Sequence, residues 1–187
     1  MNEPTAFERR YQLDPDPWNF AHAPYERERY ATMLRSLGRL RYGAAYEPGC
    51  SIGEFTALLA PRCETVDASD ISPTAVAAAR RRCAAYPQVK VTVGALPDQL
   101  PRGPFDLIVF SELGYYFSEG ALRLLGASLY ERLLPGGELM AVHWLGHSAD
   151  HVLHGNDAAR ILRDCLGSAQ AEERIEAGFR VDLWRRA

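Results

Sequence analysis

The stretch EPGCSIG, residues 47–53, lies between an apolar run at residues 43–47 and an amphipathic run at residues 54–59. This pattern predicts a strand, a tight turn and a helix. The free amides at the start of such a helix can meet a polar ligand. Gly49 would let the backbone approach that ligand closely, and Gly53 would allow tight packing of the helix against the sheet. A strand-to-helix turn that binds no ligand is the alternative interpretation.

An acidic residue closes the next predicted strand, residues 64–70. Asp70 lies about 20 residues beyond Gly49, the offset at which a carboxylate accepts ribose hydroxyls in dinucleotide-binding folds. Asp67 is the competing acid, but Asp70 is the one that immediately precedes the next predicted helix. Ser72 is predicted to cap that helix, and the alternative role of Asp70 is to stabilise the helix N-terminus.

Further along the chain, short runs of β-forming residues alternate with longer amphipathic runs, the pattern of a parallel sheet covered by helices. The run FDLIVF, residues 105–110, is almost wholly apolar, as expected for a strand buried on both faces. The turn at 177–178 is too short for a crossover helix, so the two runs beside it should pair antiparallel. The other predicted strands lie at about 89–93, 138–144, 172–176 and 179–185; helices are predicted at about 25–40, 72–85, 119–134 and 157–166, with an irregular segment at 11–24.

The predicted architecture is a single α/β domain with a Rossmann-like fold. It has a seven-stranded, mostly parallel sheet with an antiparallel last strand and helices on both faces. A chain of 187 residues is typical of one domain. Within it we expect residues 1–40 to form an N-terminal lid and helix, and residues 41–187 to form the ligand-binding core.

Charge and composition disfavour several classes of protein. The net charge of −3 gives no general field that would attract phosphate backbones. No apolar run is long enough to span a membrane, and residues 1–10 lack the apolar core of a secretory signal. The four cysteines form no CxxC pair, as expected of reduced core residues. We therefore expect a cytoplasmic monomer or homodimer that binds neither nucleic acid nor membrane.

Five motifs, in order along the chain, resemble those of class I S-adenosylmethionine (SAM)-dependent methyltransferases. They are Glu47-x-Gly49-x-x-x-Gly53, Asp70-Ile71-Ser72-Pro73, Gly94-Ala95-Leu96-Pro97, Phe105-Asp106-Leu107-Ile108 and Leu134-Pro135-Gly136-Gly137. A narrower resemblance is to the nodulation protein S (NodS) family, whose members methylate the nitrogen of a deacetylated glucosamine residue. It rests on Asp16-Pro17-Trp18, Tyr25-Glu26-x-x-Arg29-Tyr30, Ser111-Glu112-x-x-Tyr115-Tyr116 and the segment 143–157.

The resemblance implies a binding site for SAM and for its product, S-adenosylhomocysteine (SAH). Glu47 would order the methionine end, and Asp70 would bind the ribose. Many family members carry an acidic residue after the glycine that Gly94 matches; Ala95 stands there instead, so a backbone oxygen would meet the adenine amino group. The implied cofactor-binding residues are Glu47, Gly49, Gly53, Asp70, Ile71, Ala95, Leu96 and Ser111.

The resemblance also implies an acceptor site. Glu112 and His143, both at predicted strand ends, are the candidate catalytic bases. The candidate substrate-binding residues are Trp18, Tyr115, Tyr116, His147 and Asp150. For the two tyrosines the alternative is a cover over a helix end, and for Trp18 it is a hydrophobic anchor, with Tyr11 a weaker candidate of the same kind.

Four histidines, at positions 143, 147, 151 and 154, are candidate metal ligands. Their spacing suits zinc only on a helix, whereas His143 lies in a predicted strand, so we predict no metal site.

Methyl transfer needs only alignment of the reacting atoms, exclusion of water and removal of a proton. The resemblance to the NodS family implies a methyltransferase that acts on a small-molecule acceptor, an amine of an amino sugar or oligosaccharide.

Three other functions compete with this interpretation. A small-metabolite O-methyltransferase would carry the same motifs, and so would a SAM-binding module without catalytic activity. A dinucleotide-dependent oxidoreductase is disfavoured because the first loop lacks the GxGxxG fingerprint.

Overall fold

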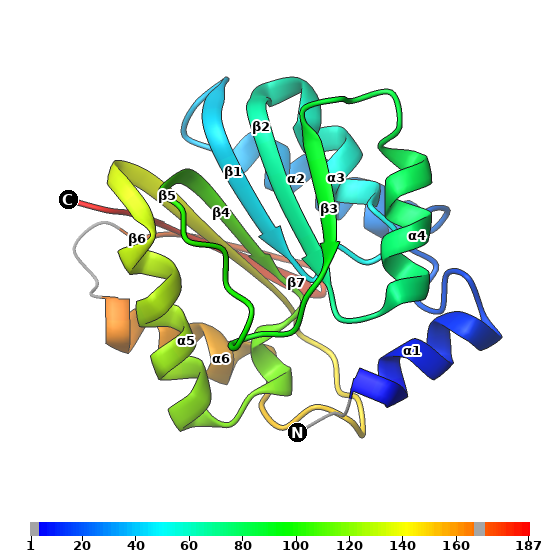
Figure 1. Ribbon diagram of the computed structural model, residues 1–187. Helices are drawn as coiled ribbons and strands as arrows, with labels where there is room; N and C mark the ends of the chain where they lie inside the picture. The colour runs from blue at the N-terminus through cyan, green and yellow to red at the C-terminus, as the bar shows by residue number, and fades with distance from the viewer. Residues whose placement is uncertain (1–3, 167–170) are drawn as a thin grey trace. The chain divides into compact units, whose positions relative to one another are not determined.

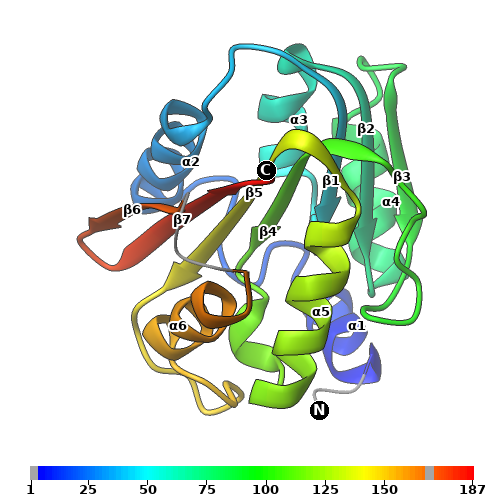
Figure 2. The ribbon, with the colours of Figure 1, turned by 90° about the vertical axis from the view of Figure 1, so that its left-hand side faces the viewer.

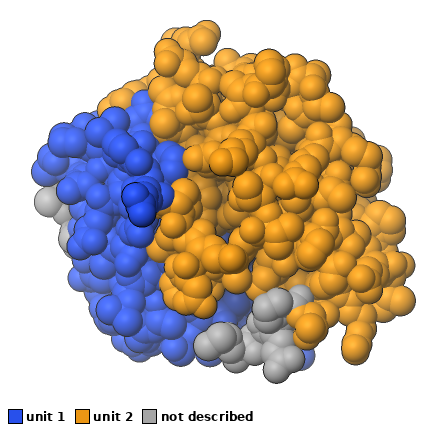
Figure 3. Space-filling view, viewed as in Figure 1, with its two compact units in different colours: residues 1, 102–187 blue, residues 2–101 orange. Residues whose placement is uncertain are grey.

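The computed structural model describes residues 4–166 and 171–187. The chain divides into two compact units, residues 2–101 (unit 2) and residues 102–187 (unit 1), which Figure 3 shows in different colours. In the described residues, no helix is both long and apolar enough to cross a membrane.

Unit 2 contains three parallel strands in the order β3-β2-β1. Pro48 lies opposite Ser69, and Asp70 lies opposite Val93, so the carboxyl ends of the three strands lie level with one another. Figure 1 shows the three arrows side by side. The strands are β1 (Tyr42–Pro48), β2 (Cys63–Asp70) and β3 (Val89–Val93).

The helices of unit 2 begin and end at recognisable signals. Ser72 caps α4, because its Oγ accepts a hydrogen bond from the amide of Ala75 at 3.0 Å and Pro73 takes the first helical position. Val76 and Ala79 of α4 pack against Val91 of β3 in a buried apolar cluster. The helices are α1 (Pro4–Leu13), α2 (Pro24–Ser36), α3 (Glu54–Leu59) with the 3-10 turn η1 (Ala60–Arg62), and α4 (Pro73–Arg82).

Three sequence predictions for unit 2 were wrong in detail. Residues 11–13, predicted to be irregular, form the last turn of α1. Helix α2 ends at Ser36, four residues early, because Leu37 adopts an extended conformation with ψ of 130°. Helix α4 ends at Arg82, before the predicted end at Ala85.

Unit 1 contains four strands in the order β4-β5-β7-β6. Strands β4 and β5 are parallel, and β7 runs antiparallel to both of its neighbours, as predicted for the terminal pair. The strands are β4 (Phe105–Ser111), β5 (Leu133–Trp144), β6 (Ala171–Glu176) and β7 (Phe179–Arg185).

The start of β5 differs from the prediction. The helix expected at 119–134 ends at Glu131, and the strand expected from Glu138 already begins at Leu133. Leu133 pairs with Phe105 and Glu138 with Leu107, so the residues around the two glycines bulge out of the ladder. The Pro-Gly-Gly segment therefore lies within the strand, as an irregularity.

The helices of unit 1 lie side by side in Figure 2 and pack against each other and against β5. Leu122, Leu125 and Leu129 of α5 are all buried, as their helical spacing predicts. These helices are α5 (Glu119–Glu131) and α6 (Gly155–Leu166), preceded by the 3-10 turn η2 (Gly114–Tyr116).

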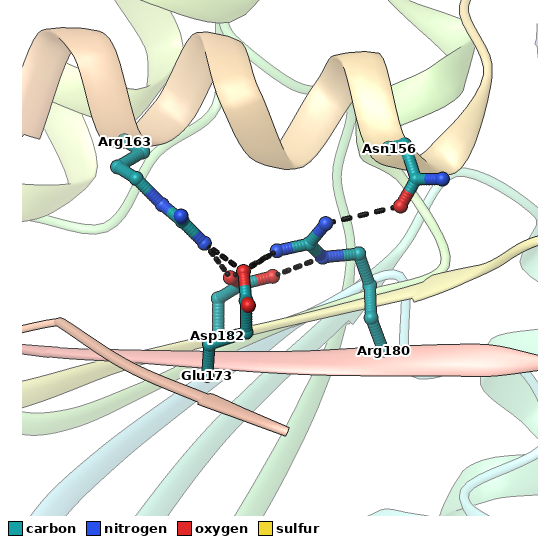
Figure 4. A network of polar contacts seen from close by, with 5 residues as sticks. All are labelled: Asn156, Arg163, Glu173, Arg180 and Asp182. Atoms are coloured by element: carbon teal, nitrogen blue, oxygen red, sulfur yellow. Dashed lines mark hydrogen bonds and ion pairs between the residues drawn. The ribbon is translucent and has the colours of Figure 1, made fainter. Parts of the chain in front are cut away.

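Polar side chains join α6 to the β6-β7 pair (Figure 4). The guanidinium of Arg180 donates two hydrogen bonds to Asp182, at 2.8 and 2.7 Å, and a third to Asn156 Oδ1 at 3.0 Å. Arg163 donates to the same Asp182 carboxylate at 2.9 Å, and Glu173 accepts from both arginines. Asp182 is fully buried, so its charge depends on these partners for compensation.

The predicted fold class is confirmed. The seven strands form a mixed sheet in which only β7 runs antiparallel, with helices packed against the strands of each unit. The proposed boundary at residue 40 stays a prediction.

Candidate functional site

The loop after β1 has an unusual backbone. Gly49, Ser51 and Gly53 all adopt left-handed conformations, with φ of 67°, 52° and 81°. The Cys50 amide donates to the carbonyl of Ser69 at 2.9 Å, which ties the loop to the end of β2. The predicted sequence of strand, glycine turn and helix is confirmed, and the left-handed region explains the glycines.

Gly53 has a different packing role from the one predicted. A Cβ at this position would lie 2.9 Å from the Cα of Ala79 in α4, closer than real side chains approach. The glycine therefore allows the start of α3 to pack against helix α4, whereas we expected it to allow packing against the sheet.

Asp70 occupies the end of β2, as predicted, and binds two backbone amides. One carboxylate oxygen accepts from the amide of Ser51 and the other from the amide of Ser72, each at 2.9 Å. Burial raises the pKa of Asp70 to about 6. A carboxylate offers about four lone-pair sites, so these bonds leave acceptor capacity for ribose hydroxyls. The ribose role and the helix-stabilising role are thus compatible in one side chain.

Glu47 lies near the end of β1 with its carboxylate enclosed. Only 4 % of the residue is exposed, and its Oε2 has no hydrogen-bond partner among the described residues. Burial, with the nearby charge of Asp70, raises the pKa of Glu47 to about 7, although the Thr56 side chain acts in the opposite direction. A buried acceptor without a partner is costly and favours a donor from a ligand. The ammonium group at the methionine end of SAM is such a donor, so this residue fits the cofactor.

Helix α1 attaches to the same part of unit 2. The Tyr11 hydroxyl donates to Ser51 Oγ at 2.6 Å, while Glu8 accepts from the hydroxyls of Ser72 and Thr74 at 2.5 and 2.6 Å. These hydrogen bonds lower the pKa of Glu8 to about 2. Sequence reasoning missed Glu8 and gave Tyr11 little weight. The available signal was their spacing of three residues, which places both on one face of a helix.

Trp18 belongs to an aromatic cluster over the loop. Its ring lies 5.4 Å from that of Tyr11 and 5.7 Å from that of Phe20, and the cluster includes Ile52 and Ala75. These contacts fit the hydrophobic-anchor alternative. Contact between Trp18 and a substrate stays a prediction.

The segment after β3 carries the residues expected to meet adenine. The Gly94 amide donates to the Asp70 carbonyl at 2.9 Å, which holds this segment against the end of β2. Ala95 and Leu96 are half-buried, and the Ala95 amide donates to Gln99 Oε1 at 2.8 Å. Gln99, which sequence reasoning did not single out, therefore shapes the segment.

In unit 1, Ser111 and Glu112 follow one another at the end of β4. Glu112 adopts a left-handed conformation with φ of 59°, and its amide donates to the Val142 carbonyl of β5 at 2.8 Å. Its Oε2 accepts a hydrogen bond of 2.5 Å from the Tyr115 hydroxyl. A left-handed conformation is uncommon for a residue other than glycine, and such conformations cluster at functional sites.

His143 lies one residue before the end of β5 and is fully buried. Neither ring nitrogen has a hydrogen-bond partner among the described residues, and a Cβ at Gly114 would lie 2.2 Å from Nε2. Burial lowers the pKa of His143 to about 4, so the ring is neutral at physiological pH. Its role as a base stays a prediction. Because the His143 ring is enclosed, Glu112 is the better placed of the two candidate bases.

Aromatic rings gather around His151 beside Glu112. The His151 ring stacks on that of Tyr115, with 3.9 Å between centroids, and meets Tyr116 and Trp144 at 5.2 and 6.0 Å. Sequence reasoning considered His151 only as a metal ligand. Stacking partners 36 residues apart leave no periodic signal in a sequence.

The other predicted acceptor residues lie in the same segment of unit 1. His147 is exposed, with its ring 5.0 Å from that of His154, and Asp150 accepts a hydrogen bond from Ser148. In residues 4–166 and 171–187, no three His, Cys, Asp or Glu side chains are grouped to hold a metal ion. Substrate binding by His147 and Asp150 stays a prediction.

Comparison with known proteins identifies the family. Residues 5–136 match the family model of Nodulation protein S (NodS). The chain belongs to the NodS family. Nodulation protein S of Rhizobium tropici is 36 % identical over 127 residues, which make up 67 % of this chain and 53 % of that protein. This chain thus spans about half the length of the curated NodS relatives it matches.

Solved structures agree with this family and with the fold. A Pseudomonas syringae protein assigned as a methyltransferase is 40 % identical, with a TM-score of 0.77 over 87 % of this chain and 99 % of that one. N-methyltransferase NodS from Bradyrhizobium japonicum WM9, in complex with SAH, gives a TM-score of 0.84 over 99 % of both chains. At 24 % identity this second match shows the shared fold. Both resemblances noted in the sequence are therefore confirmed.

Proposed function

We propose that this protein transfers the methyl group of SAM to the amine of a small molecule. The observation that carries the proposal is the enclosed Glu47 carboxylate, which lies at the end of β1 beside a left-handed loop and Asp70. In a member of the NodS family, this arrangement fits the methionine end and the ribose of SAM.

The cofactor supplies a methyl group already activated by its sulfonium charge. Glu47 would accept hydrogen bonds from the ammonium group and Asp70 from the ribose hydroxyls. Ala95 and Leu96 would border the adenine. Because the donor is activated, the protein contributes mainly by orienting the reactants and excluding water.

The acceptor amine must attack in its neutral form. Its nitrogen bonds to the methyl carbon while the carbon–sulfur bond breaks, and the bonding electrons leave on sulfur to give SAH. Glu112, half-buried at the end of β4, accepts the proton that the acceptor ammonium loses before the attack, and the methylated product leaves as an ammonium. Tyr116 would border the acceptor, and contact between Tyr115 and the acceptor stays a prediction.

An amino sugar or oligosaccharide is the acceptor class we favour. The B. japonicum NodS structure is that of an N-methyltransferase, which supports a nitrogen acceptor here.

Four free cysteines, three of them buried, support a cytoplasmic location, where thiols stay reduced.

The deciding experiment is a SAM-consumption assay of the purified protein against two acceptor panels. One contains amino sugars and deacetylated chitooligosaccharides, and the other contains phenolic and carboxylate metabolites. Turnover on the first panel supports the proposal. Turnover only on the second favours an O-methyltransferase, and SAH binding without any turnover favours a non-catalytic module.

The Asp70→Ala variant should bind SAH more weakly by ~1 to 3 kcal/mol, because two ribose hydroxyls lose their acceptor. Calorimetric titration measures this loss. Asp67→Ala, in the same strand but three residues before its end, is the matched control and should bind like wild type. Equal affinity of both folded variants would remove Asp70 from the site.

The affinity for SAH should rise with pH across the pKa of Glu47. With that pKa at about 7, the carboxyl is largely neutral in mildly acid solution and cannot pair with the ligand's ammonium. Above about pH 8 it is ionised and binding should reach a plateau. Titrations from about pH 6 to 8 check this. Glu47→Gln should bind weakly at every pH, and a retained pH dependence in it would assign the effect to Asp70.

A further inference from the structure

Tyr115 uses its hydroxyl, its ring and its backbone carbonyl in different contacts with other residues of unit 1. Its hydroxyl donates to Glu112 Oε2 at 2.5 Å, and one face of its ring stacks on His151 with 17° between the planes. Its carbonyl accepts from the amides of Val152 and Leu153, at 2.8 and 3.1 Å. With 3 % exposure, the side chain has little freedom to move.

Residues 145–154, which include residues that contact Tyr115, form a closed loop. His154 Nε2 lies 2.9 Å from the carbonyl of Leu145 and joins the two ends of the segment. His151 lies in this segment and meets Tyr116 and Trp144 in edge contacts, with interplanar angles of 88° and 85°. Three rings therefore hold the imidazole, and the imidazole in turn holds the face of Tyr115.

Glu112 is held at its backbone and at one carboxylate oxygen. The amide bond to Val142 sets the left-handed backbone, which turns the side chain, and the phenol hydroxyl then selects the direction of the carboxylate. A charge-assisted bond of this kind is short and directional. The Tyr115 hydroxyl thereby restricts the orientation of an otherwise flexible side chain.

We propose that Tyr115 is a positioning residue that aims the Glu112 carboxylate at the acceptor, and that His151 holds Tyr115 in place. The segment 145–154 thereby controls how well Glu112 receives the proton, through contacts that need not touch the acceptor. This inference rests on the proposed function, in which Glu112 removes a proton from the acceptor ammonium before the attack.

The test measures single-turnover methyl transfer by wild type, Tyr115→Phe, Glu112→Gln and the double variant. Phenylalanine keeps the stacked ring and removes only the hydroxyl. We expect Tyr115→Phe to lower the rate about 3- to 10-fold, the effect of one lost hydrogen bond, with the KM for the acceptor and the affinity for SAH unchanged. In the Glu112→Gln background the same change should have no further effect, because the two residues act as a unit.

The stacking contact is tested separately by two variants of His151. His151→Ala should lower the rate as much as Tyr115→Phe does, and His151→Phe should restore most of it, because an aromatic ring is retained. Tyr130→Phe is the matched control, since its hydroxyl donates only a long bond of 3.3 Å to the carbonyl of Arg185. Thermal unfolding of every variant shows whether a loss of rate is a loss of fold.

The outcomes separate this inference from the proposed function. A slow Glu112→Gln variant with Tyr115→Phe at the wild-type rate would overturn the positioning role alone, as would equal losses from Tyr115→Phe in both backgrounds. A rise in acceptor KM without a fall in rate would make Tyr115 a substrate contact and overturn the inference. Absence of turnover by wild type, or a fast Glu112→Gln variant, would overturn the role of Glu112 and the inference with it.

Discussion

The Glu112→Gln variant is expected to transfer methyl groups ~100-fold or more slowly than wild type, with SAH affinity nearly unchanged. Glutamine keeps the shape of the side chain and can still meet the Tyr115 hydroxyl, but it cannot take a proton from the acceptor. Glu47 and Asp70, the residues proposed to bind the cofactor, are unchanged in this variant. Steady-state kinetics on the amine acceptor, with calorimetry on SAH, measure the two effects separately.

Glu131→Gln is the matched control, because Glu131 is exposed at the last residue of α5. It should retain the wild-type rate. A Glu112→Gln variant that is equally fast would exclude Glu112 as the proton acceptor and leave His143 as the next candidate. Because His143 is fully buried and neutral, it could serve only after a rearrangement that exposes it.

The second large effect is expected in stability. Asp182→Asn should lower the free energy of unfolding by ~3 to 5 kcal/mol, the usual result when one partner of a buried ion pair is removed. Asparagine keeps the volume, but the buried guanidinium of Arg180 then loses the carboxylate that accepts two of its hydrogen bonds. Chemical denaturation followed by circular dichroism measures the change.

Asp157→Asn gives the matched comparison in the same unit. Asp157 pairs with Arg160 at 3.5 Å, and both side chains are more than half exposed, so solvent screens the pair and its loss should cost under ~1 kcal/mol. If Asp182→Asn costs no more than this control, Glu173 must balance Arg163 and Arg180 without Asp182.

Local patterns in the sequence predicted much of the fold. The strands 89–93 and 179–185 and the helix 54–59 have the bounds that periodicity and turn residues predicted. The capping of α4 by Ser72 followed from one residue type next to a proline. Such features depend on neighbours within a few residues, which explains why they can be predicted without knowledge of the tertiary structure.

Other features depend on residues far apart in the sequence. Helix α1 was missed because its buried face is completed by Ile52 and Ala75, which follow Tyr11 by dozens of residues. The packing role predicted for Gly53 was wrong because the backbone that lies close to it belongs to Ala79 of another helix. In both cases the contact that decides the outcome comes from a different element.

The sequence by itself determined the family, the order of strands and helices, and the positions of Glu47, Asp70 and Glu112 at strand ends, because ordered motifs and periodicity are local properties. Only the tertiary structure decided the state of these groups. Burial raises the pKa of Glu47, two backbone amides bind Asp70, and Tyr115 with His151 orients Glu112. The physical reason is that desolvation and hydrogen bonding depend on every atom around a group, whatever its distance along the chain.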